Sequence, residues 1–317
     1  MRAIVTDPST PHGIGLGETP DLAPTPDDVL VRVQAISLNQ GEVRRAMDSA
    51  PAGWVPGWDF TGVVERAASV GVSPAVGDRV VGFLPEGAWK ERVAAPARAL
   101  AVLPDAVSTN VAATLPVAGL TALFALSEGG LLAGRLAGKT VLVNGASGGV
   151  GHLAVQLARA SRAFVVAAVR REGQRRDAEA DGAHRVIVSE DLSGARAEGP
   201  FDLILESAGG AALGNALHSL AADGTCVSFG NSSRTPTTFD PLAFFYPHGG
   251  TRLVGFYLLA ALERQPASEG LARLAQLVSD GVLRPRIEVE ASWSDVGAVV
   301  QRFMRREITG KVVLHVD

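Results

Sequence analysis

The clearest hydrophobic pattern in the chain begins at Val141, where a short apolar run predicts a buried strand. Glycines and small residues follow, and apolar residues then recur with helical spacing from Val150 to Ala158. Strands and helices continue to alternate beyond this point, which predicts a parallel, doubly wound sheet. The predicted strands are 141–143, 163–169, 186–188, 202–205, 224–230 and 251–258, with helices at 150–158, 172–180 and 215–220.

A different pattern precedes residue 115. Short runs of strand-forming residues, separated by Gly and Pro, predict an all-β, barrel-like domain. Its predicted strands are 1–5, 29–36, 63–65, 76–82 and 88–94, with a short helix within 37–47 and a tight turn at 56–62. An apolar helix is predicted at 115–127. Near the C-terminus we predict helices 270–279 and 293–305 and strands 287–289 and 311–316. We expect this C-terminal part to pair back onto the first domain.

Composition narrows the class of protein. A chain of 317 residues, 47% apolar and 20% charged, predicts a globular protein of about two domains. The net charge is −4 and no block of one sign occurs, so we expect no nucleic-acid partner. The apolar runs are too short to span a membrane, and the N-terminus has no apolar signal region. We therefore expect a cytoplasmic protein without a membrane partner.

Cysteine content restricts the possible chemistry further. Cys226 is the only cysteine, which excludes an intrachain disulfide and a multi-cysteine zinc site. It lies in a predicted strand, where we expect a small, buried, apolar residue.

The turn after the strand at 141–143 has the features of a phosphate-binding site. Gly148 and Gly151 fill the second and third positions of the G-x-G-x-x-G pattern, and Ala146 stands at the first. Glycines let the backbone approach a pyrophosphate, and a helix N-terminus offers N–H groups and partial positive charge. The alternative is an ordinary turn that binds nothing. We predict a dinucleotide site whose residues are Ser147, Gly148, Gly149, Val150 and Gly151.

Several stretches spread along the chain share one resemblance. They are PGWDFTG (56–62), VGDRV (76–80), LPVAGLTA (115–122), NGASGGVG (144–151), FDLILESAGG (201–210) and GKVVL (310–314). Together they resemble the zinc-independent medium-chain dehydrogenase/reductase superfamily, in its quinone oxidoreductase and enoyl reductase branch. The resemblance implies an α/β protein with a Rossmann doubly wound parallel sheet domain at 117–259, which binds NADP. It also implies a GroES-like, mostly β catalytic domain formed by 1–116 and 260–317, with the active site in the cleft between the domains.

The same resemblance bears on zinc. Zinc-dependent relatives carry an early cysteine ligand and a histidine in the turn that begins at Pro56. Here Ser37 lies in the first region and Trp58 stands at the histidine position. Asp59 remains, but one carboxylate is no metal site, so we predict no metal-binding residues. Hydride transfer without a Lewis acid favours acceptors that are already electrophilic, such as quinones and α,β-unsaturated carbonyls.

The residues after the second strand of the doubly wound region indicate which nicotinamide cofactor is bound. NAD-specific turns usually place an acidic residue about 20 positions after the glycines. Here Arg170 and Arg171 stand at that place, with Arg175 beyond, and a guanidinium suits the 2′-phosphate of NADP. There are two alternatives to a 2′-phosphate site here. Glu172 could contact a ribose hydroxyl, or the arginines could belong to a basic turn that is simply exposed to solvent. We predict NADPH as the cofactor.

Catalytic candidates come from the resemblance and from the need for a proton. The resemblance implies an active-site asparagine at Asn39, whose amide could orient the nicotinamide or a substrate carbonyl; the alternative is a helix cap. Tyr246 is our candidate proton donor. Tyr257, or a water molecule, are alternatives, and either tyrosine could simply be a packing residue.

Further cofactor contacts are predicted outside the glycine turn. The resemblance favours Thr121, in the apolar helix, although its hydroxyl could instead bond its own backbone. Ligands of open α/β sheets bind at the carboxyl ends of strands, which makes Ala208, Gly230 and Asn231 candidates as well.

Taken together, these observations predict an NADPH-dependent oxidoreductase that transfers hydride to a quinone or an α,β-unsaturated carbonyl without zinc. One alternative is an enoyl thioester reductase of a biosynthetic pathway, which residues 37–47 loosely resemble. The other is a catalytically inactive NADPH-binding structural or sensor protein. The apolar strand 251–258, together with the resemblance, predicts a homodimer.

Overall fold

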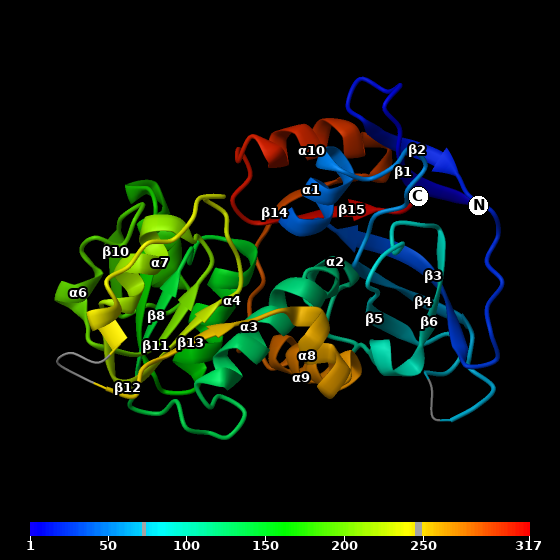
Figure 1. The fold of residues 1–317 in the computed structure, drawn as a ribbon. Coiled ribbons are helices and arrows are strands. Elements are labelled where there is room, and N and C mark those ends of the chain that lie inside the picture. The colour runs from blue at the N-terminus through cyan, green and yellow to red at the C-terminus, as the bar shows by residue number, and fades with distance from the viewer. Residues whose placement is uncertain (72–73, 245–248) are drawn as a thin grey trace. The chain divides into compact units, whose positions relative to one another are not determined.

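The structure, a computed structural model, describes residues 1–71, 74–244 and 249–317. Contacts divide the chain into two compact units (Figure 1). Residues 1–120 and 262–317 form the terminal unit, and residues 121–261 form the central unit. Both ends of the chain therefore belong to the same unit.

The central unit is built on a six-stranded sheet in the order β10-β9-β8-β11-β12-β13, in which every neighbouring pair is parallel. This confirms the predicted doubly wound sheet. The order reverses between β8 and β11, and this reversal is the switch point of the sheet. The strands are β8 (Thr140–Asn144), β9 (Phe164–Val169), β10 (Arg185–Val188), β11 (Phe201–Glu206), β12 (Leu220–Ser228) and β13 (Arg252–Gly255).

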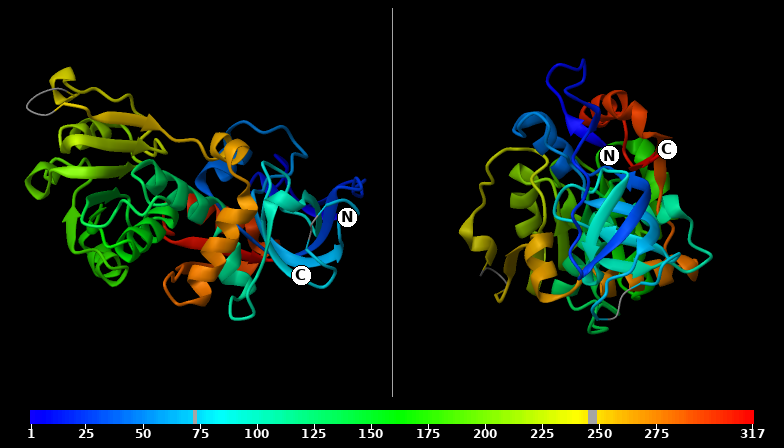
Figure 2. Two further views of the ribbon diagram at one scale, coloured as in Figure 1. Left: turned by 90° about the horizontal axis from the view of Figure 1, so that it is seen from below. Right: turned by 90° about the vertical axis from the view of Figure 1, so that its right-hand side faces the viewer.

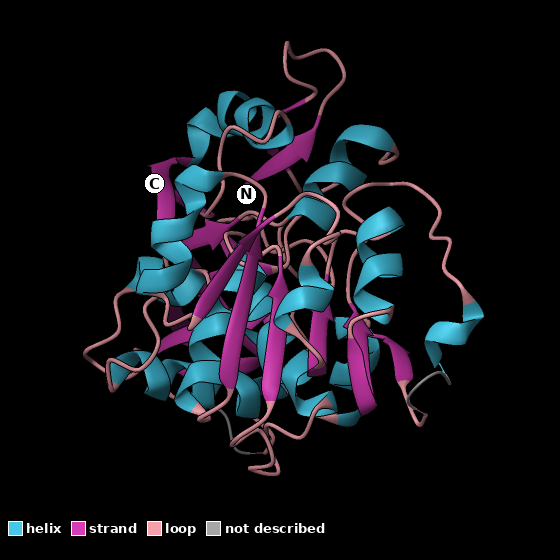
Figure 3. Ribbon diagram, turned by 90° about the vertical axis from the view of Figure 1, so that its left-hand side faces the viewer, coloured by secondary structure: helices cyan, strands magenta, loops and turns pink. Residues whose placement is uncertain are grey.

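Helices flank this parallel sheet (Figure 3). Val141, Leu142 and Val143 of β8 are fully buried, as expected for a strand covered on both faces. The helical segments are α3 (Pro116–Glu128), α4 (Gly149–Ala160), η2 (Glu172–Gln174), α5 (Arg175–Ala180), α6 (Ala195–Glu198), α7 (Gly210–Leu217), η3 (Pro241–Phe244) and α8 (Leu258–Arg264). Within the described residues, no helix has both the length and the apolar character needed to cross a membrane.

The terminal unit contains a seven-stranded sheet in the order β14-β15-β3-β4-β5-β7, with β6 paired to β3, and a separate β1-β2 hairpin. Its blue and cyan strands curve around one another (Figure 2). β15 pairs antiparallel with β3, matching Leu314 to Ile36, so the C-terminal part does pair back onto the first domain. The strands are β1 (Arg2–Thr6), β2 (Ile14–Glu18), β3 (Asp28–Ser37), β4 (Asp59–Arg66), β5 (Arg79–Phe83), β6 (Arg92–Pro96), β7 (Leu100–Val102), β14 (Ile287–Ser292) and β15 (Lys311–His315).

Alternation of buried and exposed residues explains why β3 forms a half-buried strand, since Val29, Val31 and Val33 are buried and Arg32 between them is exposed. The same residues contribute to the core of the terminal unit. The helical segments of this unit are α1 (Gln40–Asp48), η1 (Ala97–Ala99), α2 (Thr109–Ala113), α9 (Ala267–Ser279), η4 (Trp293–Asp295) and α10 (Val296–Met304).

Several predicted boundaries differ from the structure. The expected turn at 56–62 is a strand from Asp59 onward, because these residues pair with β3 on one side and with β5 on the other. Gly62 permits the close approach to β3, since a Cβ there would be 2.1 Å from the Arg32 carbonyl oxygen. The helix expected at 215–220 is α7, which begins earlier and ends before β12. The strand expected at 251–258 stops at Gly255, and α8 begins at Leu258.

Candidate cofactor-binding and catalytic sites

The glycine turn between β8 and α4 has a backbone that only glycine permits. Gly145 has a φ of 74°, and its carbonyl oxygen accepts a hydrogen bond from the Gly148 N–H at 2.9 Å. A Cβ at Gly151 would lie 2.2 Å from that same oxygen. The first N–H groups of α4 have no acceptor within the helix, as at every helix start. The turn therefore fits a phosphate group through backbone donors and the helix dipole.

The structure brings the predicted residues of three loops together at the carboxyl end of the sheet. The loops follow β8, β11 and β12, which are neighbouring strands. The Ser233 N–H donates to the Ala208 carbonyl oxygen at 2.8 Å, and a Cβ at Gly209 would lie 2.4 Å from Asn231 Oδ1. Ala208 and Asn231 thus lie on loops that contact each other. This is the edge at which open α/β sheets bind ligands.

Glu206 is a residue of this edge that the sequence analysis missed. It ends β11, is fully buried, and accepts hydrogen bonds from Asn144 Nδ2 at 2.8 Å and from the Ala208 N–H at 2.7 Å. An acidic residue at the end of an apolar run is the sequence signal that could have identified Glu206. Such a position is expected to be buried, and a buried carboxylate must be hydrogen-bonded.

The arginines predicted to bind the 2′-phosphate lie at and beyond the end of β9. Arg170 and Arg171 are exposed there. Arg175 pairs with Glu172, with Nη2 and Oε2 3.3 Å apart, and donates to the Val186 carbonyl oxygen at 3.0 Å. The hydrogen bond from Arg175 lowers the pKa of Glu172, so this carboxylate is charged and already holds a cation. Arg171 is therefore better placed than Arg175 to bind an anionic ligand.

The remaining candidates of the central unit have different outcomes. Thr121 is buried in α3, with 6% of its surface exposed. Tyr246 lies outside the described residues, so its predicted role stays a prediction. Tyr257 is 65% exposed, which does not fit a packing role. Cys226 is fully buried, as predicted, and burial raises the pKa of its thiol.

In the terminal unit, Asn39 lies in a buried polar network directly before α1. Its Nδ2 group donates to Glu42 Oε1 at 2.9 Å and to Asp59 Oδ2 at 2.8 Å. Its Oδ1 accepts from Lys311 Nζ at 2.7 Å. Both amide hydrogens are therefore used, and only a lone pair of Oδ1 stays available for a cofactor or substrate. The predicted role of Asn39 is restricted to accepting a hydrogen bond or to supporting α1.

Asp59 is satisfied on both carboxylate oxygens. Oδ2 also accepts from Ser37 Oγ at 2.7 Å and from Lys311 Nζ at 3.2 Å, while Oδ1 accepts from the Val117 N–H at 3.0 Å. A lysine and a backbone N–H thus bind the two oxygens of this carboxylate. In the described part of the chain, no group of three or more His, Cys, Asp or Glu side chains could hold a metal ion.

Glu42 adds a second buried carboxyl group to this network. It is fully buried, and its Oε1 accepts from the Asn39 backbone N–H at 2.8 Å, whereas its Oε2 has no partner among the described residues. Burial raises the pKa of Glu42 well above its usual range, the nearby Asp59 charge raises it further, and Lys311 opposes both. Two acids therefore share one cation, and the surroundings of Glu42 favour its protonated form.

Sequence reasoning missed Glu42 and Lys311. The spacing of Asn39 and Glu42, three residues apart before a helix, resembles the capping box and could have indicated their contact. Lys311 gave no such signal, because its partners lie more than 250 positions earlier in the chain.

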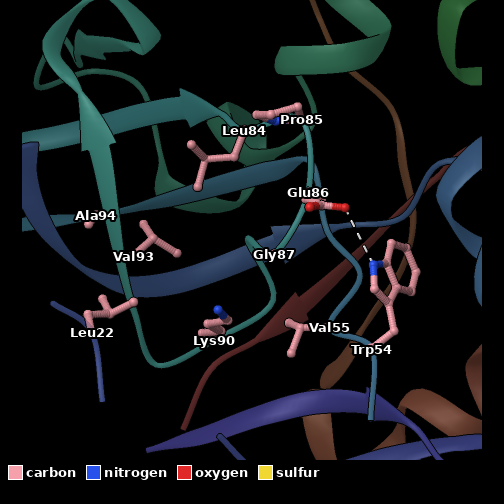
Figure 4. A pocket seen from close by; sticks show the side chains of 10 residues that line it. All are labelled: Leu22, Trp54, Val55, Leu84, Pro85, Glu86, Gly87, Lys90, Val93 and Ala94. Carbon is pink, nitrogen blue, oxygen red and sulfur yellow. Dashed lines mark hydrogen bonds between the residues drawn. The ribbon is translucent and has the colours of Figure 1, made fainter. Parts of the chain in front are cut away.

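Trp54 lines a pocket of about 380 Å³ within the terminal unit (Figure 4). Its indole Nε1 donates to Glu86 Oε2 at 3.5 Å, and Cζ of the Arg45 guanidinium lies 4.6 Å from the centroid of the indole ring. Because Arg45 belongs to α1, this helix connects the pocket to the Asn39 network. The pocket combines apolar side chains with the charged residues Glu86 and Lys90, and its lining residues are Leu22, Trp54, Val55, Leu84, Pro85, Glu86, Gly87, Lys90, Val93 and Ala94.

Comparisons with known proteins indicate the family of this chain. Residues 25–105 match the alcohol dehydrogenase GroES-like domain, and residues 149–275 match the zinc-binding dehydrogenase family. The chain is 30% identical over 327 residues to the phthioceranic/hydroxyphthioceranic acid synthase of Mycobacterium tuberculosis; the match covers 100% of the chain but only 15% of the synthase.

Solved structures extend the comparison. A mycobacterial quinone oxidoreductase matches with a TM-score of 0.87 and 26% identity, covering 100% of both chains. Mycobacterial Rv1454c, solved in complex with NADPH, matches with a TM-score of 0.84 and 25% identity, also covering 100% of both chains. The chain belongs to the medium-chain dehydrogenase/reductase superfamily and resembles its quinone oxidoreductase branch.

Proposed function

We propose that the protein is an NADPH-dependent oxidoreductase that reduces a quinone or an α,β-unsaturated carbonyl without zinc. The observation that carries this proposal is the phosphate-binding turn at the switch point of the central sheet, with Arg170 and Arg171 at the end of the next strand. The NADPH complex of a similar structure supports the choice of cofactor.

The residues of the chain have separable tasks in this proposal. NADPH supplies the hydride when it is bound. The glycine turn holds the pyrophosphate through backbone N–H groups, and Arg171 binds the 2′-phosphate through charge-assisted hydrogen bonds. The Asn39 network fixes the start of α1 in the catalytic domain. Holding both reactants in a reactive geometry supplies much of the rate enhancement.

Zinc independence follows from which residues stand at the positions of the family's ligands. Ser37 and Trp58 occupy those regions, and neither side chain is a zinc ligand. Asp59 is neutralised by Lys311, so it does not need a metal ion for charge balance. The substrate must therefore be electrophilic without a Lewis acid, which favours quinones and conjugated carbonyls.

A screen of NADPH oxidation tests the proposal. The purified protein is assayed with quinones, enones, simple aldehydes and enoyl thioesters, each with NADPH and with NADH. We expect turnover of quinones or enones with NADPH, weak activity with NADH, and none with simple aldehydes. A clear preference for NADH would contradict the cofactor assignment, and turnover that depends on added zinc would contradict the mechanism.

A second function is favoured by one specific comparison. The whole chain aligns with a segment of synthases that are named for phthioceranic and mycocerosic acids. Such a segment would suit an enoyl reductase that acts on thioester-linked intermediates. Activity on enoyl thioesters but not on quinones would favour this alternative. Tight NADPH binding without hydride transfer to any acceptor would instead favour a non-catalytic role.

The edge strand β13 supports a homodimer. It is the last strand of the central sheet, and it carries Leu253, whose surface is 41% exposed. An exposed edge strand with apolar side chains is a template for pairing with a second copy. Light scattering at micromolar concentration should therefore give the mass of a dimer, and a monomeric mass would contradict this proposal.

A further inference from the structure

The carboxylate of Glu206 connects the two sides of the switch point in the central sheet. Glu206 is the last residue of β11, and Asn144 is the last residue of the neighbouring strand β8. Glu206 Oε1 accepts from Asn144 Nδ2 at 2.8 Å and from the Ala208 N–H at 2.7 Å, while Oε2 accepts from the Gly209 N–H at 3.0 Å. One buried carboxylate thus holds the end of β8 against the loop after β11.

The adjacent backbone extends this connection to the loop after β12. The Glu206 carbonyl oxygen accepts from the Phe229 N–H at 3.0 Å, and the Ser207 carbonyl oxygen accepts from the Ser232 N–H at 3.1 Å. Ser207 Oγ also donates to the Asn144 carbonyl oxygen at 3.4 Å. The three loops that carry the predicted cofactor contacts therefore meet at Glu206 and Ser207.

The surroundings of the Glu206 side chain require acceptors on both of its carboxyl oxygens. Among the described residues its three hydrogen-bond partners are all N–H donors, and a carboxylate is an acceptor on both oxygens. A glutamine of the same shape would turn an NH₂ group toward at least one of these donors. Because the site is fully buried, a donor left without an acceptor has no water to compensate it.

We propose that Glu206 is a positioning residue that holds the loops on both sides of the switch point in the geometry required to bind a complete dinucleotide. The inference rests on the proposed binding of NADPH. In a doubly wound sheet each half binds one mononucleotide, and the dinucleotide lies across the point where the strand order reverses. A ligand that spans both halves should depend on Glu206, whereas a ligand confined to the adenosine half should not.

The test compares these two kinds of ligand on the full chain. The probes are NADPH, followed by its fluorescence, and adenosine 2′,5′-bisphosphate, followed by calorimetry. The variant is Glu206→Gln, and Asn144→Ala provides a second, milder variant that removes only the bond across the switch point. The matched control is Asp202→Asn at the opposite end of β11. Asp202 likewise accepts from the start of β8, from Lys139 Nζ at 2.7 Å and the Thr140 N–H at 2.8 Å.

We expect Glu206→Gln to weaken NADPH binding by at least about tenfold, as the loss of a hydrogen bond to a charged group implies. Binding of adenosine 2′,5′-bisphosphate should change by less than about threefold, because this ligand occupies one side only. Asn144→Ala should show the same selectivity with a smaller loss. Asp202→Asn should lower the unfolding midpoint but leave both dissociation constants unchanged.

Other results would overturn the inference. Equal weakening of both ligands in Glu206→Gln would indicate general structural damage, as would weakening of NADPH binding by Asp202→Asn. If Glu206→Gln does not fold, Asn144→Ala decides: unchanged NADPH binding there would contradict the proposed connection. A wild-type protein that binds NADPH but reduces no acceptor would refute the proposed reaction and leave this test valid. A wild-type protein that binds no nicotinamide dinucleotide would refute both.

Discussion

Lys311 and Asp59 form an ion pair inside the terminal unit, with Nζ and Oδ2 3.2 Å apart. The Lys311 side chain is 3% exposed and the Asp59 side chain is 0% exposed. The pair joins β15 to β4. Asn39 is hydrogen-bonded to both members, since its Nδ2 group donates to Asp59 and its Oδ1 accepts from Lys311. Removing one member of a buried pair leaves an uncompensated charge, which costs far more than the loss of an exposed pair.

Lys311→Met should therefore lower the free energy of unfolding by roughly 3–5 kcal/mol, measured by urea denaturation. The matched control is Lys139→Met. Lys139 also pairs with an aspartate, but its side chain is 51% exposed, so the expected loss is no more than about 1 kcal/mol. Equal losses in the two variants would contradict the buried network.

Glu42 should make stability depend on pH in the direction opposite to an ordinary ion-paired acid. The pKa of Glu42 is raised above its usual 4.5 in the folded protein, chiefly by burial. Its contribution to stability is therefore fully present below pH 4.5 and is lost as the pH rises through the folded pKa. The glutamine of Glu42→Gln cannot titrate. Between pH 4.5 and the folded pKa of Glu42, the free energy of unfolding of this variant should therefore rise relative to wild type by about 1.4 kcal/mol per pH unit.

Urea denaturation between about pH 4 and pH 8 measures this difference. Glu91→Gln is the control of opposite sign, because hydrogen bonds from Arg2 lower the pKa of Glu91. The contribution of Glu91 is present above its unfolded pKa and is lost as the pH falls through the folded value. A Glu42→Gln curve that runs parallel to wild type over the whole range would show that Glu42 is not held neutral.

Arg171→Ala should change the cofactor preference. If Arg171 binds the 2′-phosphate, its loss should raise the dissociation constant of NADPH by about 10- to 100-fold, as expected for a charge-assisted hydrogen bond. NADH has no 2′-phosphate, so its dissociation constant should stay the same. Fluorescence titration measures both. Arg196→Ala, at another exposed arginine of the central unit, should affect neither, and an unchanged NADPH affinity in Arg171→Ala would assign the 2′-phosphate to other residues.

Leu253→Lys should convert the proposed dimer to a monomer. A lysine on an edge strand opposes pairing with a second copy, because the charge would have to be desolvated. Size-exclusion chromatography with light scattering measures the mass. Val282→Lys is the matched control in the terminal unit, since Val282 and Leu253 are each 41% exposed. A dimeric Leu253→Lys protein would place the contact elsewhere.

Local sequence was sufficient for the order of strands and helices in the central unit. A buried parallel strand needs only a short apolar run, and the helix after β8 shows its period within the stretch 141–160. The glycine turn was predicted for the same reason, because a positive φ at Gly145 and the close approach at Gly151 depend on near neighbours. Where local signals conflicted, as at 56–62, the prediction failed, because the residues from Asp59 onward form a strand through their pairing with β3 and β5.

The polar networks depended on the tertiary structure. Sequence alone determined the alternation of strands and helices, the position of the glycine turn and the lack of cysteine ligands for zinc. It did not indicate that Lys311 would pair with Asp59, that burial would raise the pKa of Glu42, or that Glu206 would join three loops. The hydrophobic pattern of the sequence does not show whether a single charged residue is exposed or is buried beside a partner. That outcome depends on segments that meet only in the folded chain.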